Sequence, residues 1–184
     1  VDFSSSYVNS VKLPQKARRA FSPSFGLAWM ISSEDFMSSA KAIDYLKLRL
    51  TGGIINYDAG IGGFFDYIGR YAKSTGYQWN ELNWGNEGVV AVQGENNVMG
   101  FEKRREMNIG IEGSFFHQML ALEANIFSSL NYDMVTRAQT IYPTFYSQFI
   151  PYVNFDKNAY KGAEIGLTFN RKLGDFRIVL GANA

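Results

Sequence analysis

Apolar and polar residues alternate along several stretches of the chain with the two-residue period of a β-strand. The clearest stretch runs from Met107 to Tyr132 and is interrupted only at residues 116–118, which predicts two antiparallel strands joined by a tight turn. A similar hairpin is predicted from Ala163 to Ala182, with its turn at residues 171–175. Earlier strands are predicted at Phe25–Ile31 and Leu46–Thr51, with a weaker one at Val1–Val8. The pattern therefore predicts an all-β, antiparallel fold.

The two faces of the predicted strands differ in charge. Within these stretches the apolar faces contain no charged residue, which a transmembrane barrel requires because Lys or Arg on the lipid side near mid-bilayer costs about 2–4 kcal/mol. A soluble β-sandwich shows the same alternation, so this pattern alone leaves both architectures open. In a barrel the opposite face lines the lumen, and its candidate residues are Lys47, Arg49, Glu112, Glu123, Asn125, Glu164 and Arg177.

Strand length and loop asymmetry favour the barrel. The runs 101–115 and 119–135 extend to about 15 residues, against about 5 to 6 for a typical globular strand. Two tight turns alternate with long excursions at 54–100 and 136–160, as in outer-membrane barrels with short periplasmic turns and long outer loops. Residues 32–43 are expected to form a short helical turn on the periplasmic side. We expect residues 1–184 to form one architectural unit.

The composition narrows the chemistry that the chain can perform. There is no cysteine, and His117 is the only histidine. Lys and Arg total 18 against 17 Asp and Glu, so no net field favours nucleic acid. We expect no catalytic residues, no metal site, no cofactor and no enzymatic activity.

Two predicted outer loops are rich in aromatic residues. Such side chains either pack against neighbouring loops or contact a nutrient or a protein partner. The candidate contact residues are Tyr142, Phe145, Tyr146, Phe149 and Tyr152 in one loop, and Phe65, Tyr67, Trp79 and Trp84 in the other.

Four segments carry more specific motifs. They are Phe21-Ser-Pro-Ser-Phe-Gly-Leu-Ala-Trp29 followed by Ile31-Ser-Ser-Glu-Asp-Phe36, Ile43-Asp-Tyr-Leu-Lys-Leu-Arg49, Phe101-Glu-Lys-Arg-Arg-Glu-Met-Asn-Ile-Gly-Ile-Glu112, and Gly162-Ala-Glu-Ile-Gly-Leu-Thr-Phe169. In their order and spacing, which cover nearly the whole chain, they resemble strands of the SusC/RagA-like TonB-dependent outer-membrane transporters.

This resemblance implies a 22-stranded barrel with a plug in its lumen, to which the chain contributes about seven to nine strands from the C-terminal half. It also implies import of oligosaccharides or peptides, a SusD-like surface lipoprotein, and TonB acting through a plug that we expect to lie outside these residues. The lumen-facing residues named above are then candidate plug contacts.

The chain departs from the family pattern at Thr51–Tyr57, lacks the usual Asn-Pro before the third motif, and has Phe101 where relatives have Trp. These departures leave open a structural subunit of a larger outer-membrane complex that has lost transport. A soluble β-sandwich adhesin or glycan-binding module is the remaining alternative.

Overall fold

The computed structural model describes residues 1–76, 87–137, 139–146 and 149–184. Seven strands form one antiparallel sheet in the order β1-β2-β3-β6-β7-β8-β9, and β4 and β5 form a separate antiparallel pair. The strands are β1 (Asp2–Asn9), β2 (Arg19–Met30), β3 (Ile43–Tyr57), β4 (Arg70–Ser74), β5 (Gly88–Gln93), β6 (Glu102–Phe115), β7 (Leu120–Arg137), β8 (Tyr152–Leu173) and β9 (Phe176–Asn183). The predicted seven to nine antiparallel strands are confirmed.

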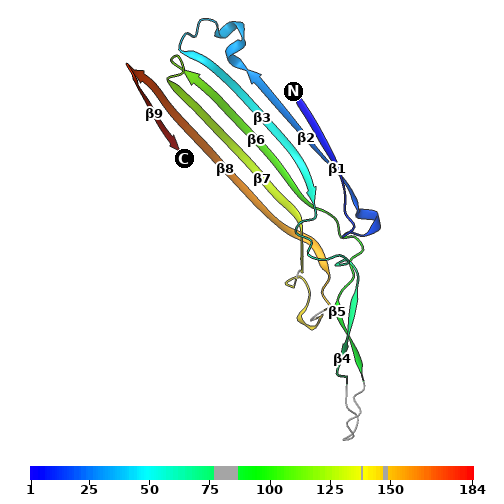
Figure 1. Ribbon diagram of the computed structural model, residues 1–184. Helices are drawn as coiled ribbons and strands as arrows, with labels where there is room; N and C mark the ends of the chain where they lie inside the picture. The colour runs from blue at the N-terminus through cyan, green and yellow to red at the C-terminus, as the bar shows by residue number, and fades with distance from the viewer. Residues whose placement is uncertain (77–86, 138, 147–148) are drawn as a thin grey trace.

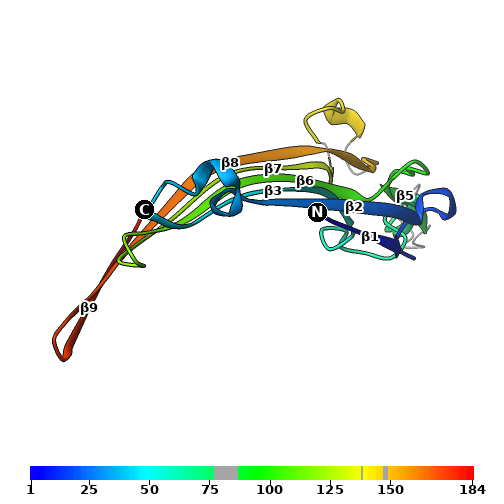
Figure 2. The same ribbon diagram turned by 90° about the horizontal axis from the view of Figure 1, so that it is seen from above.

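The seven-stranded sheet is a single curved layer, with the small β4–β5 pair beyond one end of it (Figures 1 and 2). Among the described residues, the buried hydrophobic side chains are Leu13, Ile61, Met99, Phe101 and Ile150, none of which lies on the apolar face of the sheet. A β-sandwich packs two sheets face to face about 10 Å apart. Because no second sheet formed by the described residues covers the apolar face, the sandwich alternative is wrong for the fold.

The predicted tight turns form where the backbone departs from extended geometry. Phe116, His117 and Gln118 have φ values of 56°, 59° and 64° between β6 and β7, and Gly174 has a φ of 61° between β8 and β9. Only Gly enters this left-handed region without steric cost, so the three consecutive non-glycine residues hold a strained turn. Both predicted hairpins are confirmed.

The predicted link between the second and third strands contains two short 3-10 turns, η2 (Ile31–Ser33) and η3 (Asp35–Met37). These turns lie at the same end of the sheet as the β6–β7 and β8–β9 turns, which we call the turn end (Figure 1). The long connections gather at the opposite end, which we call the loop end (Figure 1). The predicted loop asymmetry is therefore confirmed.

Both long loops are shorter in the structure than the sequence predicts, because strands extend into the predicted loop residues. β3 continues to Tyr57, three residues beyond the predicted loop start, and β8 already begins at Tyr152. β8 reaches 22 residues, and its start pairs with the end of β7 across an irregular stretch in which Asp133 has a φ of 56°. The extra residue of a bulge breaks strict alternation, which is why this part of the strand resembles a loop in sequence.

The strand registers align the apolar faces into rows. One row contains Trp29, Leu48, Ile111, Ala124 and Ile165, contributed by five adjacent strands. No side chain of this row is buried: Ile165 is 46% exposed, and Ile126 on the same face is 64% exposed. We call it the outward face and the opposite one the inward face.

The outward face carries charge at its borders, contrary to the prediction of a charge-free face. Arg105 pairs with Leu130 and Lys161 with Ser128 toward the loop end, while Arg171 pairs with Ile178 toward the turn end. Lys161 and Arg171 are ten residues apart on β8. With a rise of about 3.3 Å per residue and a tilt of about 40°, they bracket an apolar band about 25 Å tall, which is the height typical of a membrane barrel.

No helix in the described part of the chain has the length and apolar character needed to cross a membrane.

Candidate functional site

Five of the predicted lumenal residues meet on the inward face of β3, β6 and β7. Arg49 lies at the centre: its Nη1 is 2.9 Å from Glu112 Oε1, and its Nη2 is 3.8 Å from Glu123 Oε1. Arg49 Nη2 also donates to Asn125 Oδ1 at 3.1 Å. Lys47 Nζ lies 3.6 Å from Glu112 Oε2, and Asn125 Nδ2 donates to Glu123 Oε1 at 3.2 Å. We call these five residues the inward charge cluster.

The registers explain why the cluster forms. Lys47 is directly opposite Glu112, and Glu112 is directly opposite Glu123, so the two carboxylates would repel each other without a cation between them. Arg49 supplies that cation from the next row, and Gly110 beside it has no side chain to block its path. A Cβ at Gly110 would collide with Asn125 Oδ1. The cluster is therefore a charge-balanced patch on a wet surface and half-exposed, with Arg49 at 36%.

The other two predicted lumenal residues lie apart from this cluster. Glu164 is the register partner of Asn125 and also points inward, but within the described part of the chain it forms no ion pair. Arg177 lies on β9 and donates from Nε to Asn170 Oδ1 at 2.9 Å.

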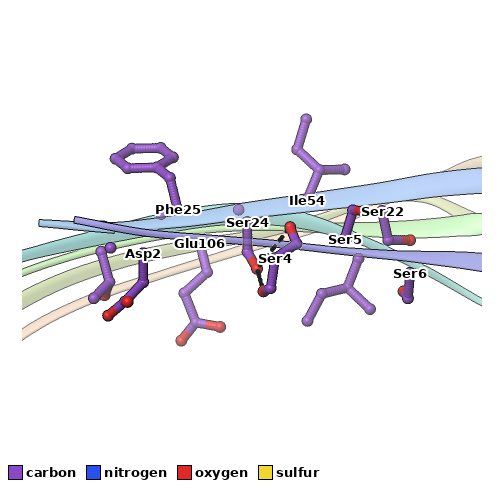
Figure 3. Close-up of a pocket in the computed structure, with 14 residues that line it drawn as sticks. Asp2, Ser4, Ser5, Ser6, Ser22, Ser24, Phe25, Ile54 and Glu106 are labelled. Carbon is purple, nitrogen blue, oxygen red and sulfur yellow. Dashed lines mark hydrogen bonds between the residues drawn. The ribbon is translucent and has the colours of Figure 1, made fainter.

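A second inward feature is a serine-rich hollow nearer the loop end, lined by β1, β2, β3 and β6. It encloses about 660 Å³ and includes Asp2, Ser4, Ser6, Ser24 and Glu106 in its lining. Figure 3 shows Asp2, Ser4 and Glu106 on one side of the sheet and Phe25 and Ile54 on the other. The Ser4 and Ser24 hydroxyls lie 2.6 Å apart in a hydrogen bond. No local pattern in the sequence indicates this hollow, because its serines come from different strands.

The loop end has its own small hydrophobic cluster. Leu13, Ile61, Met99 and Phe101 are buried there, although they come from three connections and the residue preceding β6. Two predicted contact residues, Tyr67 and Tyr152, pack against this cluster. Their position favours packing within the loops over contact with a ligand.

Two polar side chains anchor these loops to the strands. Glu102 is only 2% exposed, and its carboxylate accepts hydrogen bonds from the backbone N–H of Gly60 at 3.1 Å and of Val135 at 2.9 Å. Asn154 accepts from Gly100 N at 2.8 Å and donates to the carbonyls of Gly100 and Asp133 at 2.9 and 2.7 Å. Such bonds give hydrogen-bond partners to backbone groups of the loops and of the irregular end of β7. We call this assembly of cluster and polar bonds the loop cap.

The remaining predicted aromatics are more exposed. Phe65 is 59% exposed and adopts a φ of 74°, while Phe145 is 80% exposed and stacks on Tyr146 with ring centroids 4.8 Å apart. Tyr142 meets Tyr146 edge to face at 6.0 Å, and Phe149 is 39% exposed. Trp79 and Trp84 lie outside the described residues. Tyr142, Phe145 and Tyr146 thus form a small aromatic platform on the loop between β7 and β8.

Among the described residues, no group of three or more His, Asp or Glu side chains is placed to hold a metal ion.

Comparison with known proteins connects this architecture to a class. No protein-family model matches the chain. The chain is 31% identical over 113 residues, 61% of its length, to TonB-dependent receptor P39 of Formosa agariphila, and it covers 10% of that protein.

Solved structures of the RagAB peptide transporter superpose with a TM-score of 0.77 at 18% identity, covering 99% of this chain and 19% of theirs. The RagAB peptide importer in its open-open state gives a TM-score of 0.78 at 18% identity and covers 98% of the chain. The chain thus spans about a tenth to a fifth of the length of the proteins it matches.

The curved sheet is a stretch of the wall of an antiparallel transmembrane β-barrel. Its outward apolar band, its gathered loops and its superposition over almost the whole chain define that class. Together, the sequence and structure comparisons confirm the resemblance to the SusC/RagA-like TonB-dependent transporters, and they imply an outer-membrane location.

Proposed function

We propose that the chain forms part of the barrel wall of a TonB-dependent transporter that imports large nutrients, such as peptides or oligosaccharides, across the outer membrane. One observation carries this proposal: a single-layer sheet with an exposed apolar face about 25 Å tall superposes on RagAB over 99% of the chain. The curated relative is a TonB-dependent receptor, and the solved relatives are named as peptide importers.

In this proposal the inward charge cluster faces a water-filled lumen or a plug domain through which TonB acts. Its two carboxylates are already neutralised by Arg49 and Lys47, so it suits a wall that contacts a polar plug better than a reaction centre. We also propose that the chain is not an enzyme and contacts no nucleic acid.

The aromatic platform of Tyr142, Phe145 and Tyr146, with Phe65 on the other loop, is the proposed contact for a SusD-like surface lipoprotein or the nutrient. Exposed aromatic rings suit protein docking and stacking on sugars because they bury a large area for little loss of side-chain freedom.

The proposal is tested with the full-length protein in its native cells. A strain that lacks the gene is expected to lose uptake of the nutrient supporting its growth, and the tagged protein is expected in the outer-membrane fraction together with one surface lipoprotein. Recovery of the folded protein from the soluble fraction without detergent would contradict the membrane assignment.

A structural subunit of a larger outer-membrane complex is the second candidate function. It is favoured by the departures from the family pattern at residues 51–57 and at Phe101, which is buried in the loop cap. Stable co-purification of further barrels, combined with unchanged nutrient uptake in the deletion strain, would support this candidate over transport.

A further inference from the structure

The outward face is hollowed near its loop end. A groove of about 460 Å³ crosses β1, β2, β3, β6 and β7, and its lining includes Phe3, Phe25, Ile54, Met107, Ser128 and Arg105. Apart from Arg105 and Ser128, these outward side chains are apolar. The groove is therefore an apolar hollow with a cation at its border, on the face that we assign to the lipid.

Small residues create this hollow. Gly52 forms part of the groove beneath the ring of Phe25, and a Cβ at Gly52 would come within 2.9 Å of two ring carbons. In the same row, Met107 is the register partner of both Gly52 and Ser128. A Leu at either position would occupy the space that the groove leaves open.

Two unpaired cations border the groove. Arg105 lines it directly, and Lys161 on β8 is the register partner of Ser128. Both side chains are exposed, and neither forms an ion pair within the described ranges of the chain. The neighbouring carboxylate of Glu106 points to the inward face, on the same side of the sheet as Asp2 and Ser4 (Figure 3). There it pairs with Arg104 at 3.2 Å.

The position of the two cations along the strands indicates which leaflet of the membrane they contact. Lys161 marks the loop-end border of the apolar band on β8, and the long loops of an outer-membrane barrel face the cell exterior. A cation at that height meets the headgroups of the outer leaflet, where it gains electrostatic energy from an anionic lipid. The apolar groove beside it matches the upper part of an acyl chain.

We propose that this groove binds one phosphate-bearing glycolipid of the outer leaflet, with an acyl chain along Phe25 and Met107 and a phosphate between Arg105 and Lys161. This inference rests on the proposed function, because it requires the outward face to lie in an outer membrane. It adds a specific lipid site to a wall that otherwise needs only bulk lipid.

The test uses the full-length protein, purified in mild detergent, stripped of lipid and titrated with lipopolysaccharide in native mass spectrometry. The double variant Arg105→Gln/Lys161→Gln removes both cations, and Ser128→Leu fills the groove but keeps them. The control Arg104→Gln/Arg171→Gln removes the same charge from the inward face and the turn-end border. Folding of every variant is checked by its heat-modifiable migration on gels.

We expect the cation variant to weaken lipopolysaccharide binding by at least about tenfold, since each interfacial cation contributes appreciably to anionic lipid binding. Ser128→Leu is expected to weaken binding by at least about tenfold as well, because the leucine side chain fills the space for the acyl chain. The control is expected to stay within about twofold of the wild type. Unchanged binding by the cation variant would overturn the inference. Equal or tighter binding of phosphatidylglycerol would also overturn it, because the site would then be a simple phospholipid site. A protein that never inserts into membranes would refute the proposed function instead, so the two failures are distinguishable.

Discussion

The substitution Ile165→Arg tests the assignment of the outward face most directly. Ile165 lies on β8 between the border residues Lys161 and Arg171, near the middle of the apolar band, and is 46% exposed. An Arg at mid-bilayer on the lipid face of a barrel costs about 2–4 kcal/mol. The ratio of folded to unfolded protein is therefore expected to fall by about 30-fold to several hundred-fold.

The neighbouring substitution Glu164→Arg is the matched control. It introduces the same side chain one residue away, but on the inward face, where Glu164 forms no ion pair within the described part of the chain. A surface change of this kind is expected to alter stability by about 0.5 kcal/mol or less.

The assay is refolding of the full-length protein into lipid vesicles across a urea series, with the folded fraction measured by heat-modifiable migration on gels. Ile165→Arg is expected to lower the urea midpoint clearly, and Glu164→Arg to leave it close to that of the wild type. If Glu164→Arg proved as damaging as Ile165→Arg, or more so, the assignment of lipid-facing and lumenal faces would be refuted.

Three further predictions concern the inward face and the loops. Glu102→Gln is expected to destabilise the loop cap by about 1–3 kcal/mol, because it weakens the acceptor for two backbone donors. The expected result is faster limited proteolysis in the loops. An unchanged proteolysis rate would contradict the prediction. A double-mutant cycle of Arg49→Met and Glu112→Gln is expected to give a coupling of about 0.5–1 kcal/mol in urea titrations, and additivity would show that the contact is unimportant. Phe145→Ala with Tyr146→Ala is expected to weaken recovery of the surface lipoprotein or nutrient binding with an unchanged urea midpoint, whereas unaffected recovery and binding would exclude the platform as a contact.

The sequence predicted the sheet well where strict alternation coincided with a tight turn. The β6–β7 hairpin is such a case, because each apolar residue of Met107–Phe115 has an outward partner on β7 in register. The start of β8 is not predicted because its register shifts between Asn154 and Asp156, which interrupts the alternation that identifies a strand. The charges at the borders of the outward face lie just outside the apolar runs of the strands, so those runs predict a charge-free face.

The candidate site was predictable in its faces but not in its contacts. The sequence placed Arg49, Glu112 and Glu123 on one polar face, yet only the register between strands shows that Arg49 separates two facing carboxylates. The loop cap could not be predicted from local pattern, since Leu13, Ile61 and Met99 are distant in sequence and have no shared periodicity. Contacts of this type depend on how the strands bring their ends together.

The loop cap also bears on how such a wall can change its specificity during evolution. Glu102 and Asn154 hold the bases of the loops through backbone groups, which any side chain at the bonded positions would still present. The exposed aromatics, such as Phe65 and Phe145, lie outside the buried cluster. Substitutions at these exposed positions can therefore change the contact surface of the loops. The anchored loop bases and the strands beneath them stay unchanged. In the proposed transporter, a single wall design is in this way compatible with many cargoes.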